Sequence, residues 1–499
     1  MGSLKENTIR GLQWSMIAQL SRQVWRLVCT AVLSRLLAPA EYGLLSMALI
    51  FICFADLFSN LGFGQALVQR QDLEHRHINA VFGLQIALGL LLALLMCALA
   101  PAIAHFYREP RLAVIICVLA ANYIVLAFRA VPGMLLTREM NFRGLALRDM
   151  AADVVAGIAA ILMAVSGWGI WSLVGQMLLG SLASTVLVWP MLHEKPRPVL
   201  NAPALRELWG FSGGLFGSTV ITYWARNADS LLIGKFLGQT ELGLYGRAYS
   251  LMMLPLTQVS YVVNQVMFPA LSQIQHDHEK VRRVYLKALR MLAFITFPMM
   301  AGLFVTAEPF IRVLCGKQWL AVIPVFKILC GVGMYQSVGT TVGWILTSQG
   351  RTDLMFRLTI MNTVVIVVSV LIGLRWGITG VAGAYAAANV LIWYPLWHIT
   401  GRIIELRVST IMKNLMAVLF AALLMACLVW GLDRGLTVRW AAWSRLLVLS
   451  GAGVVIYLGL MVSLKKSAFM EWMDLVKISL KIAPRTVAAP DAIAPSDIL

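Results

Sequence analysis

The sequence predicts an all-α integral membrane protein of about fourteen transmembrane helices, arranged as two parallel six-helix lobes followed by two extra C-terminal helices. Composition, regularly spaced apolar runs and an internal repeat support this fold class. Of the 499 residues, 60% are hydrophobic and only 13% are charged, and the mean hydropathy is +0.80. Soluble domains average about 45–50% apolar and about 25% charged residues. We therefore expect a polytopic membrane protein without a separate soluble domain.

Apolar runs of about 20 residues recur along the chain, each long enough to cross a hydrocarbon core of about 30 Å as a helix. Charged residues, proline and glycine separate them. The first and seventh runs are amphipathic and contain Arg22, Arg26 and Arg226. The predicted spans are residues 12–36, 42–64, 79–104, 112–133, 146–166, 168–190, 207–228, 242–267, 285–307, 321–347, 354–374, 377–400, 411–431 and 443–464.

The distribution of basic residues predicts the orientation. If the N-terminus is cytoplasmic, 25 of the 41 lysines and arginines fall on cytoplasmic segments and 11 on the opposite face. This bias follows the positive-inside rule, so both termini are expected in the cytoplasm. The net charge of +18 is thereby explained by short loops and helix ends, and a nucleic-acid partner is not expected.

An internal repeat has a period of two hundred residues. Leu37, Glu41, Gly43, Leu44 and Ala48 meet identical residues in that register. The two copies are six predicted helices apart, so they share one orientation and form a parallel repeat. The predicted parts are an N-lobe, a C-lobe, helices 13 and 14, and a cytoplasmic amphipathic segment with a disordered tail: residues 1–200, 201–405, 406–465 and 466–499.

Charged residues inside the spans are the candidate site residues. A basic side chain facing lipid at mid-bilayer costs about 2.5–3.5 kcal/mol, so most should line an aqueous cavity or form pairs. Arg226 and Asp229 could form one such pair, and residues near span ends could instead extend to the interface. The candidates for a cationic, substrate-binding cavity are Arg22, Arg26, Arg129, Arg226, Arg247 and Lys327. The candidates for ion coupling are Asp56, Asp153 and Asp229. Such a cavity favours an anion, and guanidinium groups bind pyrophosphate bidentately.

Several classes of activity lack their sequence signatures. There is no GxxxxGK[ST] phosphate-binding loop, so ATP hydrolysis is not expected. The pairs His75/His77 and His276/His278 lack HExxH spacing, so we expect no catalytic metal and no cofactor. The seven cysteines form no CxxC pair. No long external loop is expected to house a catalytic site, so we do not predict an enzyme.

Four segments resemble the polysaccharide exporters of the multidrug/oligosaccharidyl-lipid/polysaccharide superfamily, and most closely the Wzx-type flippases of the colanic-acid exporter kind. These segments are residues 8–11, 33–43, 61–69 and 138–143. The resemblance implies transport of undecaprenyl-pyrophosphate-linked oligosaccharide repeat units across a bacterial inner membrane, for exopolysaccharide or O-antigen assembly. It also implies alternating access by a V-shaped pair of lobes around a cationic cavity, to which Arg22, Arg26, Arg129 and Arg226 would contribute. Membrane lipids, and a polymerase and glycosyltransferases of the same pathway, are the implied partners.

Three other functions remain as alternatives. A multidrug cation antiporter of the same superfamily would have an acidic cavity, whereas this chain has more internal arginine than aspartate. A membrane polysaccharide polymerase or ligase would have a long external loop with paired charges. A sugar/proton symporter would carry a basic loop motif after helix 2, which residues 69–79 do not match.

Overall fold

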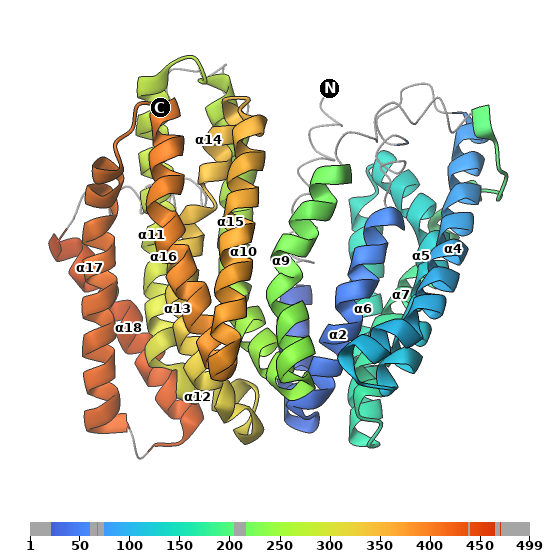
Figure 1. Ribbon diagram of the computed structural model, residues 1–499, viewed down its shortest axis with the longest axis horizontal. Helices are drawn as coiled ribbons and strands as arrows, with labels where there is room; N and C mark the ends of the chain where they lie inside the picture. The colour runs from blue at the N-terminus through green and yellow to red at the C-terminus, as the bar shows by residue number, and fades with distance from the viewer. Residues whose placement is uncertain are drawn as a thin grey trace, which may run out of the picture. The chain divides into compact units, whose positions relative to one another are not determined.

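The computed structural model describes residues 21–59, 74–203, 216–437 and 440–464, together with the isolated residues 67 and 470. Within these ranges the chain is helical and contains no strand (Figure 1). The predicted start of the first span, most of the segment 61–69 and the predicted tail 466–499 lie outside the described residues. So do residues 204–215, where the seventh span was predicted to begin.

All fourteen predicted spans overlap helices. The first is the helix of residues 21–36. The next five are α2 (Pro39–Ser59), α4 (His75–Tyr107), α5 (Arg111–Arg138), α6 (Phe142–Val165) and α7 (Ile170–Val188), which continues into η1 (Trp189–Met191). The later ones are α9 (Phe216–Leu237), α10 (Gln239–Gln273), α11 (His278–Val305), α13 (Ile323–Gly339) with α14 (Val342–Ser348), α15 (Thr352–Gly373), α16 (Gly377–Ile403), α17 (Val408–Leu432) and α18 (Ala442–Leu464). Short helical segments also occur: α12 (Ala307–Leu314), η2 (Lys317–Val322), η3 (Leu374–Trp376) and η4 (Asp433–Thr437).

Membrane-spanning character is confirmed for much of the chain. Among the described residues, nine helical stretches are long and apolar enough to cross a bilayer. One of them, Asp353–Ile403, has 51 residues, more than twice the length that one crossing needs. The protein is therefore a multi-pass membrane protein, and the total of fourteen crossings stays a prediction.

Two predicted spans differ in detail from the helices found. Predicted span 321–347 is broken between Gly339 and Val342. At the break the buried Thr341 hydroxyl lies 2.8 Å from the Tyr285 hydroxyl, and such side-chain bonds compete with a regular helix. The second difference is α9, which continues to Leu237, beyond the predicted end at residue 228. Asp229, predicted at the end of this span, therefore lies well inside the helix.

The chain divides into two compact units. One contains residues 1–251, 307–329 and 353–392, and the other contains residues 252–306, 330–352 and 393–499. In the second unit, α17 packs on α11, and Tyr457 of α18 donates a hydrogen bond to Phe294 O at 2.9 Å. There Asp277 caps α11 by accepting a hydrogen bond from Lys280 N, which lowers the pKa of the Asp277 carboxyl. The assignment of residues 1–200 and 201–405 to two lobes stays a prediction.

The repeated sequence forms a reciprocal contact inside the first unit. Helices α2 and α10 begin at Pro39 and Gln239, which are two hundred residues apart. A Cβ atom on Gly43 would overlap the backbone of Gln239, and one on Gly243 would overlap the carbonyl of Pro39. We call this the corner contact. Because two backbones meet there, only glycine fits at both positions.

The first helix packs closely against α6, because small residues of α6 face it. Leu33 and Leu37 pack against Ala160 and Ala164 of that helix. Nearer the start of α6, a Cβ on Gly157 would lie 2.8 Å from Nε1 of Trp25. Small residues allow this close helix approach in a membrane, where packing replaces the hydrophobic effect as the main attraction between helices. The approach brings Arg22 and Arg26 next to the polar residues of α6.

Candidate functional site

A cavity of about 890 Å³ lies within the first unit. The helix of residues 21–36 and helices α2, α4, α5, α6, α7 and α10 contribute to its lining. Five arginines and three aspartates line it, which leaves two net positive charges: Arg22, Arg26, Arg129, Arg148, Arg247, Asp56, Asp149 and Asp153. The surrounding helices are apolar, so this is a polar site of net positive charge among apolar helices.

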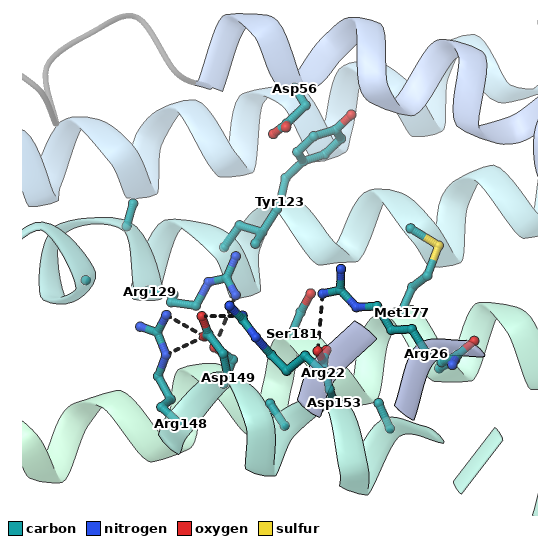
Figure 2. A pocket seen from close by; sticks show the side chains of 18 of the residues that line it. Arg22, Arg26, Asp56, Tyr123, Arg129, Arg148, Asp149, Asp153, Met177 and Ser181 are labelled. Carbon is teal, nitrogen blue, oxygen red and sulfur yellow. Dashed lines mark hydrogen bonds and ion pairs between the residues drawn. The ribbon is translucent and has the colours of Figure 1, made fainter. Parts of the chain in front are cut away.

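Two ion pairs connect the first helix to α6 (Figure 2). Arg22 Nη1 lies 3.1 Å from Asp149 Oδ2, and Arg26 Nη2 lies 3.2 Å from Asp153 Oδ2. The arginines are four residues apart and so are the aspartates, so each helix presents its pair on one face. The first pair is the more buried, since the Arg26 side chain is 62% exposed.

Asp149 also binds a second arginine. Its Oδ1 accepts hydrogen bonds from Arg148 Nη2 at 2.6 Å and from Arg148 Nε at 2.9 Å. The Arg148 side chain is only 10% exposed. Nevertheless, Arg148 Nη1 and Arg22 Nε are buried and have no hydrogen-bond partner among the described residues. Leaving buried donors unpaired costs free energy, so this part of the cavity is suited to an anionic ligand that accepts them.

Arg129 contributes a third guanidinium group to the same part of the cavity. It projects from α5 toward Arg22 and Asp149 (Figure 2). Its Nη1 donates to the Ser184 hydroxyl at 3.1 Å. Among the described residues, no carboxylate forms an ion pair with Arg129. Within the described ranges its charge is therefore not neutralised by a carboxylate in an ion pair.

Asp56 lies at the other side of the cavity in Figure 2, beside Tyr123. The Ser59 hydroxyl donates to Asp56 Oδ1 at 2.7 Å, and Gln85 Nε2 donates to Ser59 O at 3.2 Å. Within the part of the chain that the structure describes, no basic side chain forms an ion pair with Asp56. This side of the cavity therefore offers carboxylate, amide and hydroxyl groups rather than guanidinium groups.

Arg247 enters the cavity from α10, and aromatic rings contact it. Its guanidinium carbon lies 4.7 Å from the centre of the Tyr42 ring and 5.4 Å from that of the Trp319 ring. Its Nη2 donates to Thr30 O at 3.3 Å, whereas its Nε is buried and finds no hydrogen-bond partner in the described part of the chain. The residue is therefore held by cation–π contacts and keeps a free donor.

The cavity brings together most of the residues that the sequence predicted. Arg22, Arg26, Arg129 and Arg247 line it, as do Asp56 and Asp153. The other three predicted residues do not: Arg226 is exposed on α9, Lys327 is half-buried on α13, and Asp229 lies within α9. Asp229 accepts hydrogen bonds from Tyr245 Oη at 3.0 Å and from Ser230 N at 2.7 Å. The expected pair between Arg226 and Asp229 is thus replaced by a bond between α9 and α10.

The site residues predicted from the sequence did not include Arg148 or Asp149. Both lie near the start of α6, where a charge is readily explained by extension toward the interface. Asp149 precedes Asp153 by four residues, the spacing that also relates Arg22 to Arg26. Matching these two spacings would have suggested that the helices pair.

Comparison with known proteins identifies relatives over most of the chain. The profile of a family described as "Polysaccharide biosynthesis protein" matches residues 32–324. The lipopolysaccharide biosynthesis protein WzxC of Escherichia coli (strain K12) is 29% identical over 379 residues, covering 74% of this chain and 76% of WzxC. The teichuronic acid biosynthesis protein TuaB of Bacillus subtilis (strain 168) is 26% identical over 467 residues, covering 93% of this chain and 96% of TuaB.

Solved structures with the same fold include two kinds of transporter. A structure titled "Lipid II flippase MurJ, inward closed conformation" aligns with a TM-score of 0.72 and 15% identity, covering 93% of this chain and 99% of that one. An inward-facing multidrug resistance MATE family transporter aligns with a TM-score of 0.59 and 16% identity, covering 79% and 96%. At these identities the likeness shows the fold alone.

Proposed function

This chain belongs to the polysaccharide biosynthesis protein family, and on that basis we propose that it is a flippase for undecaprenyl-diphosphate-linked oligosaccharide repeat units. In this proposal it moves them from the inner to the outer leaflet of a bacterial inner membrane, for exopolysaccharide or O-antigen assembly. Relatives named for lipopolysaccharide and teichuronic acid biosynthesis support this role. Transport breaks and forms no covalent bond, so the chain needs binding groups and a conformational change.

The net positive cavity is the observation that carries the proposal. A diphosphate that joins a prenyl chain to a sugar carries one negative charge on each phosphate, and the cavity has a net charge of two positive. Arginine binds phosphate oxygens through its planar set of donors, and Arg22 and Arg148 keep buried donors free. A transporter of organic cations would need the opposite net charge in this cavity.

The cavity volume suits the polar end of such a substrate. Pockets of about 300–1,000 Å³ enclose drug-sized ligands, so about 890 Å³ accommodates a diphosphate with the first sugars.

The prenyl chain stays in lipid while the lobes alternate access. Both termini are cytoplasmic in this scheme. Arg226 and Lys327 are candidates for further cationic contacts outside the cavity, and Asp56, Asp153 and Asp229 for ion coupling.

Flipping by the purified protein tests the proposal. The protein is reconstituted into vesicles with a fluorescent undecaprenyl-diphosphate-linked sugar, and transbilayer movement is followed by quenching from outside. The double variant Arg129→Gln/Arg148→Gln should reduce the rate at least about tenfold, because each lost hydrogen bond to a charged group is worth about 1.5–3 kcal/mol.

The matched control is Arg283→Gln, which removes an exposed arginine paired with Glu279 in the second unit and should leave the rate unchanged. Equal rates for the double variant and the wild type would refute the role of the cavity. Transport of a lipophilic cation dye, but not of the glycolipid, would favour a multidrug antiporter instead.

A further inference from the structure

Side chains of η2 are attached to the end of the first helix. The indole Nε1 of Trp319 donates to Ser34 O at 2.7 Å, and Gln318 Nε2 donates to Leu37 O at 2.9 Å and also to Ser34 O. The Ser34 carbonyl lies in the last turn of the helix, where backbone acceptors lack partners within the helix, and Leu37 directly follows the helix. We call this set of bonds the latch. It lies beside the corner contact, since Leu37 is two residues before the start of α2.

The latch also joins the two copies of the repeat. The first helix and α2 belong to the first copy, whereas α10 and η2 come from the second copy. The predicted topology puts residues 37–41, 237–241 and 313–319 on the external side. The latch and the corner contact therefore hold the two copies together on one side of the membrane, within a single compact unit.

Arg247 connects this external contact to the cavity. Its guanidinium group lines the cavity and at the same time contacts Tyr42 and Trp319, whose rings lie edge to face at 5.3 Å. Trp319 is fully buried and is a member of the latch. The position of Arg247 therefore depends both on the latch and on what occupies the cavity.

We propose that Arg247 couples substrate binding to release of the external contact. Resting on the proposed function, this inference is that a diphosphate entering the cavity draws the Arg247 guanidinium away from Tyr42 and Trp319 and so weakens the latch. Phosphate oxygens form charge-assisted hydrogen bonds, which are stronger partners for a guanidinium group than ring faces. The unpaired Nε of Arg247 provides a first donor for this exchange.

The coupling follows from a difference in contacts between two states. A ligand shifts a conformational equilibrium only by as much as it binds one state better than the other. With the latch closed, the Arg247 guanidinium group contacts the Tyr42 and Trp319 rings as well as lining the cavity. With the latch open, all its donors are available to the diphosphate. The ligand therefore favours the open latch, and removing the Arg247 charge removes that preference.

Distances between spin labels at positions 36 and 236 test this inference. Leu36 and Phe236 are equivalent residues of the two copies, 44% and 62% exposed, and they lie next to the corner contact. The full-length protein is labelled there after the four cysteines that are not buried, Cys53, Cys97, Cys117 and Cys427, are changed to serine. Distances are measured in phosphatidylcholine nanodiscs by pulsed electron paramagnetic resonance, with and without undecaprenyl diphosphate.

The expected result is a ligand-dependent shift to longer distances that requires Arg247. Undecaprenyl diphosphate should increase the long-distance population of the wild type, and Arg247→Gln should abolish this increase. Trp319→Leu removes a ring and a latch bond, so it should raise the ratio of long to short distances about tenfold without ligand. Arg312→Gln is the control, because it removes an exposed arginine of α12 paired with Glu308 and should keep the wild-type shift.

Ligand binding is measured in parallel, so that a negative result can be assigned either to the proposed function or to the coupling role of Arg247. Arg247→Gln should bind undecaprenyl diphosphate more weakly than the wild type, through the other arginines of the cavity, so distances are compared at a ligand concentration that saturates each protein. A wild-type protein that binds no undecaprenyl diphosphate would contradict the proposed function itself. A wild type that binds it without a distance change, an Arg247→Gln variant that still shifts, or a Trp319→Leu variant with the wild-type distribution would overturn the coupling role alone.

Discussion

The corner contact and the cavity show two different outcomes of the same internal duplication. At the corner, the two copies are nearly equivalent: Gly43 faces Gln239 and Gly243 faces Pro39. In the cavity they are not, since Arg26 lines it and pairs with Asp153, whereas the equivalent Arg226 is exposed and outside it. Where two backbones touch, both copies need the same residue. Where side chains line the cavity, equivalent positions of the two copies differ.

The largest effect is expected at the corner contact. Gly43→Ala and Gly243→Ala each place a Cβ atom on the backbone of the other copy, and backbone cannot rotate away as a side chain can. Each should lower the free energy of unfolding by about 1–3 kcal/mol, and by similar amounts if the contact is reciprocal. Thermal unfolding in detergent measures this.

Gly246→Ala provides the control for the two glycine substitutions. The nearest atom to its added Cβ would be Ser46 Oγ at 3.8 Å, which is ordinary van der Waals contact. It should be neutral or slightly stabilising, because alanine favours the helix. Unequal losses for Gly43→Ala and Gly243→Ala would show that the two copies do not meet symmetrically.

An effect of the same size or smaller is expected from the two ion pairs between the first helix and α6. Asp149→Asn leaves Arg22 and Arg148 without their shared counter-charge in a largely buried place, and should cost about 1–3 kcal/mol of stability. Asp153→Asn should cost less than about 1 kcal/mol, because its partner Arg26 is mostly exposed. Denaturation of the two variants in the same detergent gives the comparison. Equal losses would mean that burial does not distinguish the pairs.

Hydropathy predicted the helices well, because each predicted span is a run of mostly apolar residues. The spacing of Arg22 and Arg26 also predicted a common face, and both side chains line the cavity, while their role in binding stays a prediction. The latch could not be predicted, since Trp319 bonds to a carbonyl 285 residues away in sequence. The same holds for Asp229. Its hydrogen-bond partner is Tyr245 on the next helix, and not Arg226, which is three residues away in sequence. Pattern analysis can pair residues that are close in the sequence, but it cannot pair residues that only the packing of helices brings together.

The smallest effect is expected from the equivalent arginines of the two copies. Arg26 is in the cavity, but its charge is already balanced by Asp153, and its side chain is largely exposed. Arg26→Gln should therefore reduce the flipping rate only about two- to fivefold, because exposed ion pairs contribute little free energy. Arg226→Gln should reduce it still less if the cavity of the first unit is the main diphosphate site. Both rates come from the vesicle assay with the fluorescent glycolipid. A larger loss for Arg226→Gln than for Arg26→Gln would mean that the second copy also binds the substrate, and that the duplication retained function in both halves.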